Sequence, residues 1–203
     1  MQIKKLIIAY FMVLIACLMP VSQASAQSDP VRLLQTIADN MIAGLREHKA
    51  TLKSNREVVY SLAYRYVVPY ADLDAMSQRV LPPSAWKQAT EAQRAAFKKE
   101  FTKLLIRTYA SALTNYKDQT VKFYPARGGS GNNVEVSSDI ISSQSSPIHV
   151  TYRLLRVGGE WRLYDMSVEG VSLIESFRAQ FGSILASGNM DELISRMSGH
   201  NNR

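Results

Sequence analysis

The spacing of the apolar residues changes period twice along this chain, and this change restricts the possible fold more than any other feature. Up to Tyr116 the apolar residues recur every three or four positions, which is the period of an amphipathic helix. From Val121 to Met166 they alternate with polar residues, which is the period of a half-buried strand. After Ser172 the helical period returns. Helices, then strands, then helices predict an α+β fold with an antiparallel meander rather than a doubly wound parallel sheet.

Capping residues and prolines set the expected helix ends. Asp29 and Pro30 fit the start of a first helix, and Thr90 with Gln93 fits the capping box of a long one. Ser172 with Glu175 has the same form, and Gly188 follows as a stop. We therefore expect helices over 30–46, 55–67, 72–81, 91–116 and 173–187, and a last helix after 189.

Four strands are expected between these helical regions. Their apolar residues alternate over 121–124, 134–140, 148–154 and 160–166. Gly158 and Gly159 separate the last two segments, which is typical of a two-residue hairpin turn. Short turns between successive strands predict a four-stranded antiparallel meander in one domain, residues 27–203.

The first twenty-six residues have the layout of a secretory signal peptide. Lys4 and Lys5 precede an apolar run over 6–19, and Ala24 and Ala26 fit a small-residue cleavage site. Two alternatives are a membrane anchor and a lipidated Cys17. Fourteen apolar residues are short for an anchor, because a spanning helix needs about 20. Because Cys17 is the chain's one cysteine, cleavage after Ala26 would leave no thiol for disulfides, nucleophilic catalysis or metal binding.

The pattern contains no recognisable catalytic or metal-binding motif. His48 and His149 share no ligand spacing, and the glycine-rich stretch 128–131 lacks the lysine and helix of a phosphate-binding loop. Asp165 and Glu169 lie four residues apart across a strand end, where turn and capping roles are more common than acid–base catalysis. The net charge of +7 favours an acidic partner, but export argues against a nucleic acid.

Two sequence blocks together resemble the MlaC family, also called toluene-tolerance proteins. The first is W-x-x-A-T-x-x-Q-R-x-x-F over residues 86–97, and the second is Y-D-x-x-x-E-G-V-S-L over 164–173. The resemblance covers nearly all of the chain after the leader, with a looser match over 119–146. It implies a periplasmic phospholipid carrier in which helices cover a curved antiparallel sheet and enclose an apolar cavity for acyl chains.

The resemblance also implies partners and the absence of an enzymatic role. A family member exchanges phospholipid between an outer-membrane lipoprotein–porin complex and an inner-membrane MCE-domain protein of an ABC transporter, which maintains outer-membrane lipid asymmetry. We expect a monomer that takes phospholipid as its cargo and has no cofactor, no metal and no nucleic-acid partner. The alternatives are a small-molecule enzyme using Asp165 or Glu169, and a module that binds apolar peptides in the same pocket.

The residues expected to line the acyl cavity come from the long helix and from the strands. Val168 and Val171 are expected at the mouth, where the last strand leads into the next helix. The full set is Phe97, Phe101, Leu105, Tyr109, Val136, Tyr152, Leu154, Leu163, Val168 and Val171. For each of them, ordinary core packing is the competing interpretation.

Overall fold

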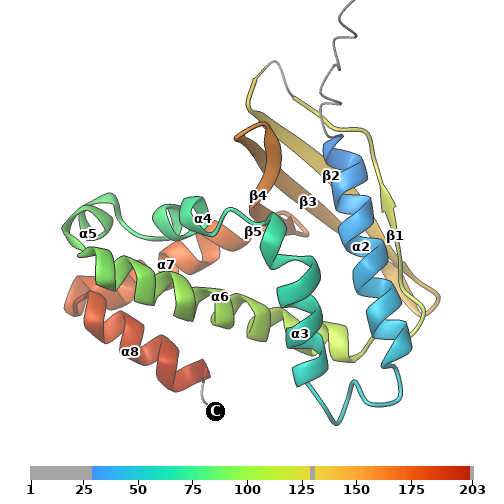
Figure 1. The fold of residues 1–203 in the computed structure, drawn as a ribbon, viewed down its shortest axis with the longest axis horizontal. Coiled ribbons are helices and arrows are strands. Elements are labelled where there is room, and N and C mark those ends of the chain that lie inside the picture. Colours follow the sequence, from blue (N-terminus) through green and yellow to red (C-terminus); the bar gives the residue numbers. More distant parts are fainter. Residues whose placement is uncertain (1–28, 129–130, 202–203) are drawn as a thin grey trace, which may run out of the picture.

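The computed structural model describes residues 29–128 and 131–201. The predicted signal peptide, residues 1–26, lies outside these residues. The described residues form seven α-helices, one short 3-10 helix and one five-stranded sheet (Figure 1). The helices are α2 (Pro30–Glu47), α3 (Glu57–Tyr66), the 3-10 helix (Val68–Tyr70), α4 (Leu73–Val80), α5 (Pro83–Gln88), α6 (Glu91–Thr114), α7 (Leu173–Ser187) and α8 (Met190–Asn201). The strands are β1 (Thr120–Phe123), β2 (Asn133–Ser142), β3 (Ser145–Val157), β4 (Glu160–Val168) and β5 (Val171–Ser172).

The predicted helix starts are confirmed by their capping hydrogen bonds. The Asp29 carboxylate accepts from the Val31 N–H at 2.9 Å, and Thr90 and Gln93 form the reciprocal capping box. The Ser172 hydroxyl accepts from the Glu175 N–H at 3.2 Å. These side chains satisfy N–H groups that have no partner inside the helix, so α2, α6 and α7 begin at the predicted residues. The helix expected from residue 55 begins at Glu57, without a side-chain cap.

The sheet is an open antiparallel meander in the order β1-β2-β3-β4-β5, which confirms the predicted α+β class. The prediction of four strands was wrong by one, because β5 pairs two residues with the end of β4. A two-residue strand cannot show an alternating pattern, so the sequence gives no period for it. The short helix α5 was also missed. It begins at Pro83, and a proline is favoured at the first position of a helix.

The outer edge of β4 is covered in two places. β5 pairs with Ser167 and Val168, while Ala71 makes a parallel bridge to Leu163 farther along the same strand. The Asp72 N–H donates to the Leu163 carbonyl at 2.8 Å. The segment before α4 therefore continues the edge that β5 begins.

Three separate clusters of buried apolar residues hold the molecule together. The first joins α4, α6, α7 and α8, and its centre is a group of phenylalanine rings with centroids 5.3–5.7 Å apart. The second joins α2, α3 and the end of α6. The third joins α2 to the inner face of the sheet. In Figure 1, α2 lies along the sheet, α4 to α8 form the other side of the molecule, and α3 stands between them.

The polar side of α6 is less exposed than its sequence pattern suggests. Glu100 is buried, and its carboxylate contacts both the Lys103 ammonium at 2.9 Å and the Asn201 amide at 2.9 Å. Arg107 donates to the Asn201 carbonyl at 2.6 Å. Helix α8 therefore packs on α6 through polar as well as apolar contacts.

Candidate functional site

Four of the predicted acyl-lining residues form solid core. Phe97, Phe101, Val136 and Leu154 have no exposed surface. The two phenylalanines belong to the cluster of α4, α6, α7 and α8, whereas Val136 and Leu154 belong to the cluster between α2 and the sheet. The structure therefore assigns these four residues to two different clusters.

The other six predicted residues are apolar or aromatic. Five of them are half-buried, and Val171 is exposed. Leu105 and Tyr109 on α6 pack against the helical cluster, and Tyr152 and Leu163 pack against the sheet cluster. Val168 is also half-buried. Leu105, Tyr109, Tyr152 and Leu163 therefore lie at the edges of the two clusters, where they are neither fully packed nor fully in water.

The inner face of the sheet forms a continuous apolar track. The register places Tyr152 between Val136 and Met166, so the three side chains share one face. Along β3 the same face runs from the buried Leu154 to Ile148, which is 41% exposed. Val171, which is 64% exposed, ends the neighbouring edge of this face. The apolar track thus leads from the core to the molecular surface.

Two tyrosine hydroxyls on these edges have raised pKa values. Burial raises the pKa of Tyr152, while the hydrogen bond from Ser138 opposes this rise. Burial also raises the pKa of Tyr109, and the negative charge of Asp165 adds to the effect. Both hydroxyls therefore stay protonated and neutral at ordinary pH.

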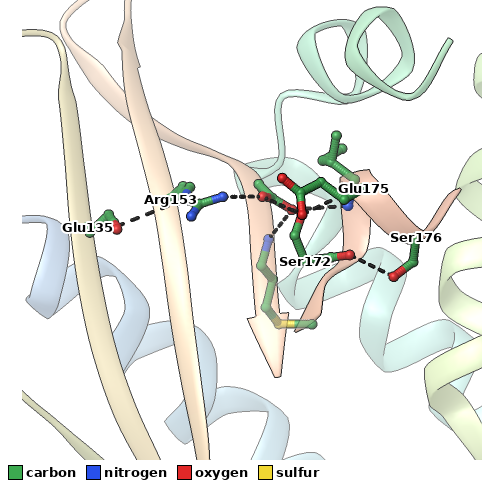
Figure 2. A network of polar contacts seen from close by, with 8 residues as sticks. Glu135, Arg153, Ser172, Glu175 and Ser176 are labelled. Atoms are coloured by element: carbon green, nitrogen blue, oxygen red, sulfur yellow. Dashed lines mark hydrogen bonds and ion pairs between the residues drawn. The ribbon is translucent and has the colours of Figure 1, made fainter. Parts of the chain in front are cut away.

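A buried carboxylate, Asp165, joins the strands to the start of α7. Figure 2 shows the polar network of this region, with Arg153 and Ser172 labelled. Asp165 is 4% exposed and accepts from Arg153 at 2.9 Å and from the Ser172 hydroxyl at 2.9 Å. It also accepts from the backbone N–H groups of Met166 at 2.8 Å and Ile174 at 3.2 Å. With four donors on its two oxygens, this carboxylate has a structural role, and the capping role predicted for it is confirmed.

The remaining acidic candidate also contacts the backbone. Glu169 has a positive φ of 50° and its carboxylate accepts from the His149 N–H. Gly170 follows with φ 80°, a backbone conformation that glycine adopts without strain. The turn between β4 and β5 therefore uses Glu169 and Gly170 for its shape. Among the described residues, no group of three or more His, Cys, Asp and Glu side chains is arranged to hold a metal ion.

Two surface hollows lie away from the predicted residues. One, of about 440 Å³, is bounded by α5, α7 and the start of α8, and the other, of about 360 Å³, opens beside Arg127, Glu135 and Arg153. Neither hollow is lined by any of the ten predicted acyl-lining residues. The apolar cavity between α6 and the sheet thus stays a prediction.

Sequence reasoning missed three participants of this region. Met166 lies on the inner face beside Tyr152, and Ser138 donates to the Tyr152 hydroxyl at 3.2 Å. Arg153 reaches Asp165 from the neighbouring strand. Strand alternation places Met166 and Tyr152 on one side once the register is known, but the register depends on a bulge at 153–154 that no residue in the sequence marks.

The fold and this region define an α+β protein with an open sheet, whose inner face is apolar and is covered by helices. Within the described ranges 29–128 and 131–201, no helix is both long enough and apolar enough to cross a membrane. The chain belongs to the MlaC family, because the family model of the MlaC protein matches residues 35–199.

Characterised relatives and a solved structure agree with this assignment. The chain is 30% identical over 200 residues to the intermembrane phospholipid transport system binding protein MlaC of Haemophilus influenzae, covering 97% of this chain and 92% of that protein. It is 27% identical to the toluene tolerance protein ttg2D of Pseudomonas putida, covering 85% of this chain and 80% of the relative. The structure matches a phospholipid-binding protein from Ralstonia solanacearum in complex with a phospholipid, with a TM-score of 0.79 and 29% identity. That match covers 86% of this chain and 98% of the other.

Proposed function

We propose that this protein binds a phospholipid and carries it through water between two membranes. The observation that carries this proposal is the structural match to a phospholipid-bound protein over 86% of the chain. The apolar inner face of the sheet, which continues to the surface at Ile148 and Val171, supports it.

We place the acyl chains between the helical cluster and the sheet cluster. Their contacts would be the half-buried Leu105, Tyr109, Tyr152, Leu163 and Val168, with Val171 at the mouth. The fully buried Phe97, Phe101, Val136 and Leu154 would form the walls behind them.

The energetics of the cargo explain why such a carrier needs partners. A diacyl lipid carries about 30 methylenes, each contributing roughly 0.8 kcal/mol on leaving water. The gross sum is on the order of 20 kcal/mol, which chain ordering and the cost of opening the cavity reduce. Spontaneous escape into water would be very slow, so delivery requires a docked complex that offers the acyl chains another apolar path.

We further propose that the protein is exported to the periplasm and exchanges lipid with one complex in each membrane. The partners would be an outer-membrane lipoprotein–porin complex and the inner-membrane MCE-domain protein of an ABC transporter. The predicted signal peptide and the name of the Haemophilus influenzae relative, a binding protein of an intermembrane phospholipid transport system, support this assignment.

The test is to purify the exported protein from cells without detergent, extract it with organic solvent and identify the lipids by mass spectrometry. We expect about one phospholipid per chain, and transfer of this lipid to vesicles only when a partner complex is present. Protein that is folded but reproducibly free of lipid, and that takes none up from vesicles, would contradict the proposal. Protease-resistant peptide in place of lipid would favour a peptide-binding module.

A further inference from the structure

Tyr152 places one polar group in the middle of the apolar inner face. It lies in β3 between Val136 and Met166, and its ring centroid is 5.8 Å from that of Phe123. The side chain is half-buried, although its neighbours on either side are apolar. Tyr152 belongs to the contact region that we assign to the lipid.

The proton of this hydroxyl has no acceptor in the part of the chain that the structure describes. Ser138, which has no exposed surface, donates its own proton to the Tyr152 oxygen at 3.2 Å. A tyrosine hydroxyl has one proton to donate, so accepting from Ser138 leaves that proton for another partner. Tyr124, on the opposite face of the sheet, differs because its hydroxyl donates to Asp139 at 2.5 Å.

Tyr109 offers a second hydroxyl from the helical side. It packs against the same cluster as Met166, which is the register partner of Tyr152. No hydrogen bond of the Tyr109 hydroxyl is present within residues 29–128 and 131–201. Each side of the apolar region therefore carries a neutral hydrogen-bond donor. Neither donor has an acceptor among the described residues.

We propose that Tyr152, together with Tyr109, donates a hydrogen bond to an ester carbonyl of the bound glycerophospholipid, so that the site selects diester over diether lipids. This inference rests on the proposed function. The ester carbonyls of a phospholipid lie where its acyl chains begin, and they accept hydrogen bonds without donating any. They therefore match the two tyrosine donors, whereas an ether lipid lacks both carbonyls and leaves the donors without this acceptor.

The experiment is a competition within one sample. Delipidated protein is incubated with vesicles that contain equal amounts of a diester and a diether phosphatidylglycerol with the same chain length. The protein is reisolated, and the ratio of the two bound lipids is measured by mass spectrometry. We expect the wild type to prefer the diester about tenfold. We expect Tyr152→Phe to reduce the ratio at least threefold, and the double variant with Tyr109→Phe to bring it close to one.

Tyr124→Phe is the matched control, since it removes a hydroxyl from the same sheet on the opposite face. It should retain the wild-type ratio. Equal binding of both lipids by the wild type would overturn the inference while leaving the carrier function intact, and this arm requires no variant to fold. An unchanged preference in Tyr152→Phe would also overturn it. Failure to load either lipid would overturn the carrier function as well.

Discussion

At the scale of single residues, the buried Asp165 joins three segments of the chain. Its oxygens contact β3 through Arg153, β5 through Ser172, and the first turn of α7 through the Ile174 N–H. Charged hydrogen bonds in a buried site contribute more than neutral ones, because each donor would otherwise lie unpaired away from water. The carboxylate therefore fixes where α7 leaves the sheet.

The substitution Asp165→Asn should lower the free energy of unfolding by about 2–4 kcal/mol, since it removes the charge and one acceptor while keeping the shape. Chemical denaturation followed by circular dichroism measures the loss. Asp74→Asn is the control: Asp74 pairs with Lys98 at 2.7 Å on the surface, where such a pair contributes less than about 1 kcal/mol. Equal effects of the two substitutions would contradict the structural role of Asp165.

At the scale of secondary-structure elements, Gly44 determines how closely α2 approaches α3. A Cβ atom at this position would lie 2.4 Å from a methyl carbon of the buried Leu62, so the side chain of Leu62 would have to move. Gly182 in α7 provides a comparison, because a Cβ atom there would meet nothing within 4 Å. Only the first glycine is required by packing.

Gly182→Ala should stabilise the protein by up to about 1 kcal/mol, because alanine favours the helix. Gly44→Ala should be less stable than Gly182→Ala by about 1–3 kcal/mol, owing to the contact with Leu62. Thermal and urea denaturation of both variants measure the difference. Adding Leu62→Ala to each variant should reduce this difference in stability. An unchanged difference would show that the contact between position 44 and Leu62 does not limit the packing.

The contact between α6 and α8 should weaken in acid. The hydrogen bond from Asn201 is the main reason that the pKa of Glu100 lies below its ordinary value of 4.5, and Lys103 acts in the same direction. A carboxylate whose pKa is lower in the folded state stabilises the protein above the unfolded pKa, and this contribution is lost as the pH falls through the folded pKa. The loss should therefore begin near pH 4.5 and be complete below the folded pKa.

The measurement is urea denaturation of the wild type and of Glu100→Gln between pH 7 and pH 3. The wild type should be the more stable at pH 7, and the difference should shrink as the pH falls below about 4.5. A difference that is independent of pH would show that ionisation of Glu100 does not stabilise this contact.

Long elements of this fold could be predicted from the sequence, whereas short elements and long-range contacts could not. Long helices and strands repeat their period several times and carry local capping groups, so α2, α6 and the hairpin at Gly158 and Gly159 could be predicted. The two-residue β5 and the six-residue α5 are too short to repeat a period. The division of Phe97 and Val136 between separate clusters depends on long-range packing, which no local pattern encodes.

At the scale of the whole molecule, the three separate clusters suggest how a ligand affects stability. Each cluster is packed within itself, while the half-buried side chains between them, such as Leu105 and Leu163, are in incomplete contact. A lipid that fills this region would contact the helical side and the sheet side at once. It would bind the folded state and not the unfolded one, and would stabilise the whole molecule.

Lipid-loaded protein should therefore unfold at a higher temperature than delipidated protein, by about 2–4 °C for each kcal/mol of stabilisation at this chain length. Differential scanning calorimetry of both forms measures the shift. Val157→Ser, at the turn between β3 and β4, should retain the full shift, whereas Leu163→Ser should reduce it because Leu163 lies in the proposed contact region. Identical melting temperatures of loaded and delipidated protein would contradict a ligand that joins the clusters.

The bridge between Ala71 and Leu163 has a consequence for solubility. An exposed edge strand has unpaired backbone groups, which can pair with a strand of another molecule and begin a fibre. β5 pairs with Ser167 and Val168, and Ala71 bridges to Leu163, so these segments occupy part of the outer edge of β4. At these positions β4 cannot pair with a strand of a second molecule, which lowers the risk of aggregation through this edge.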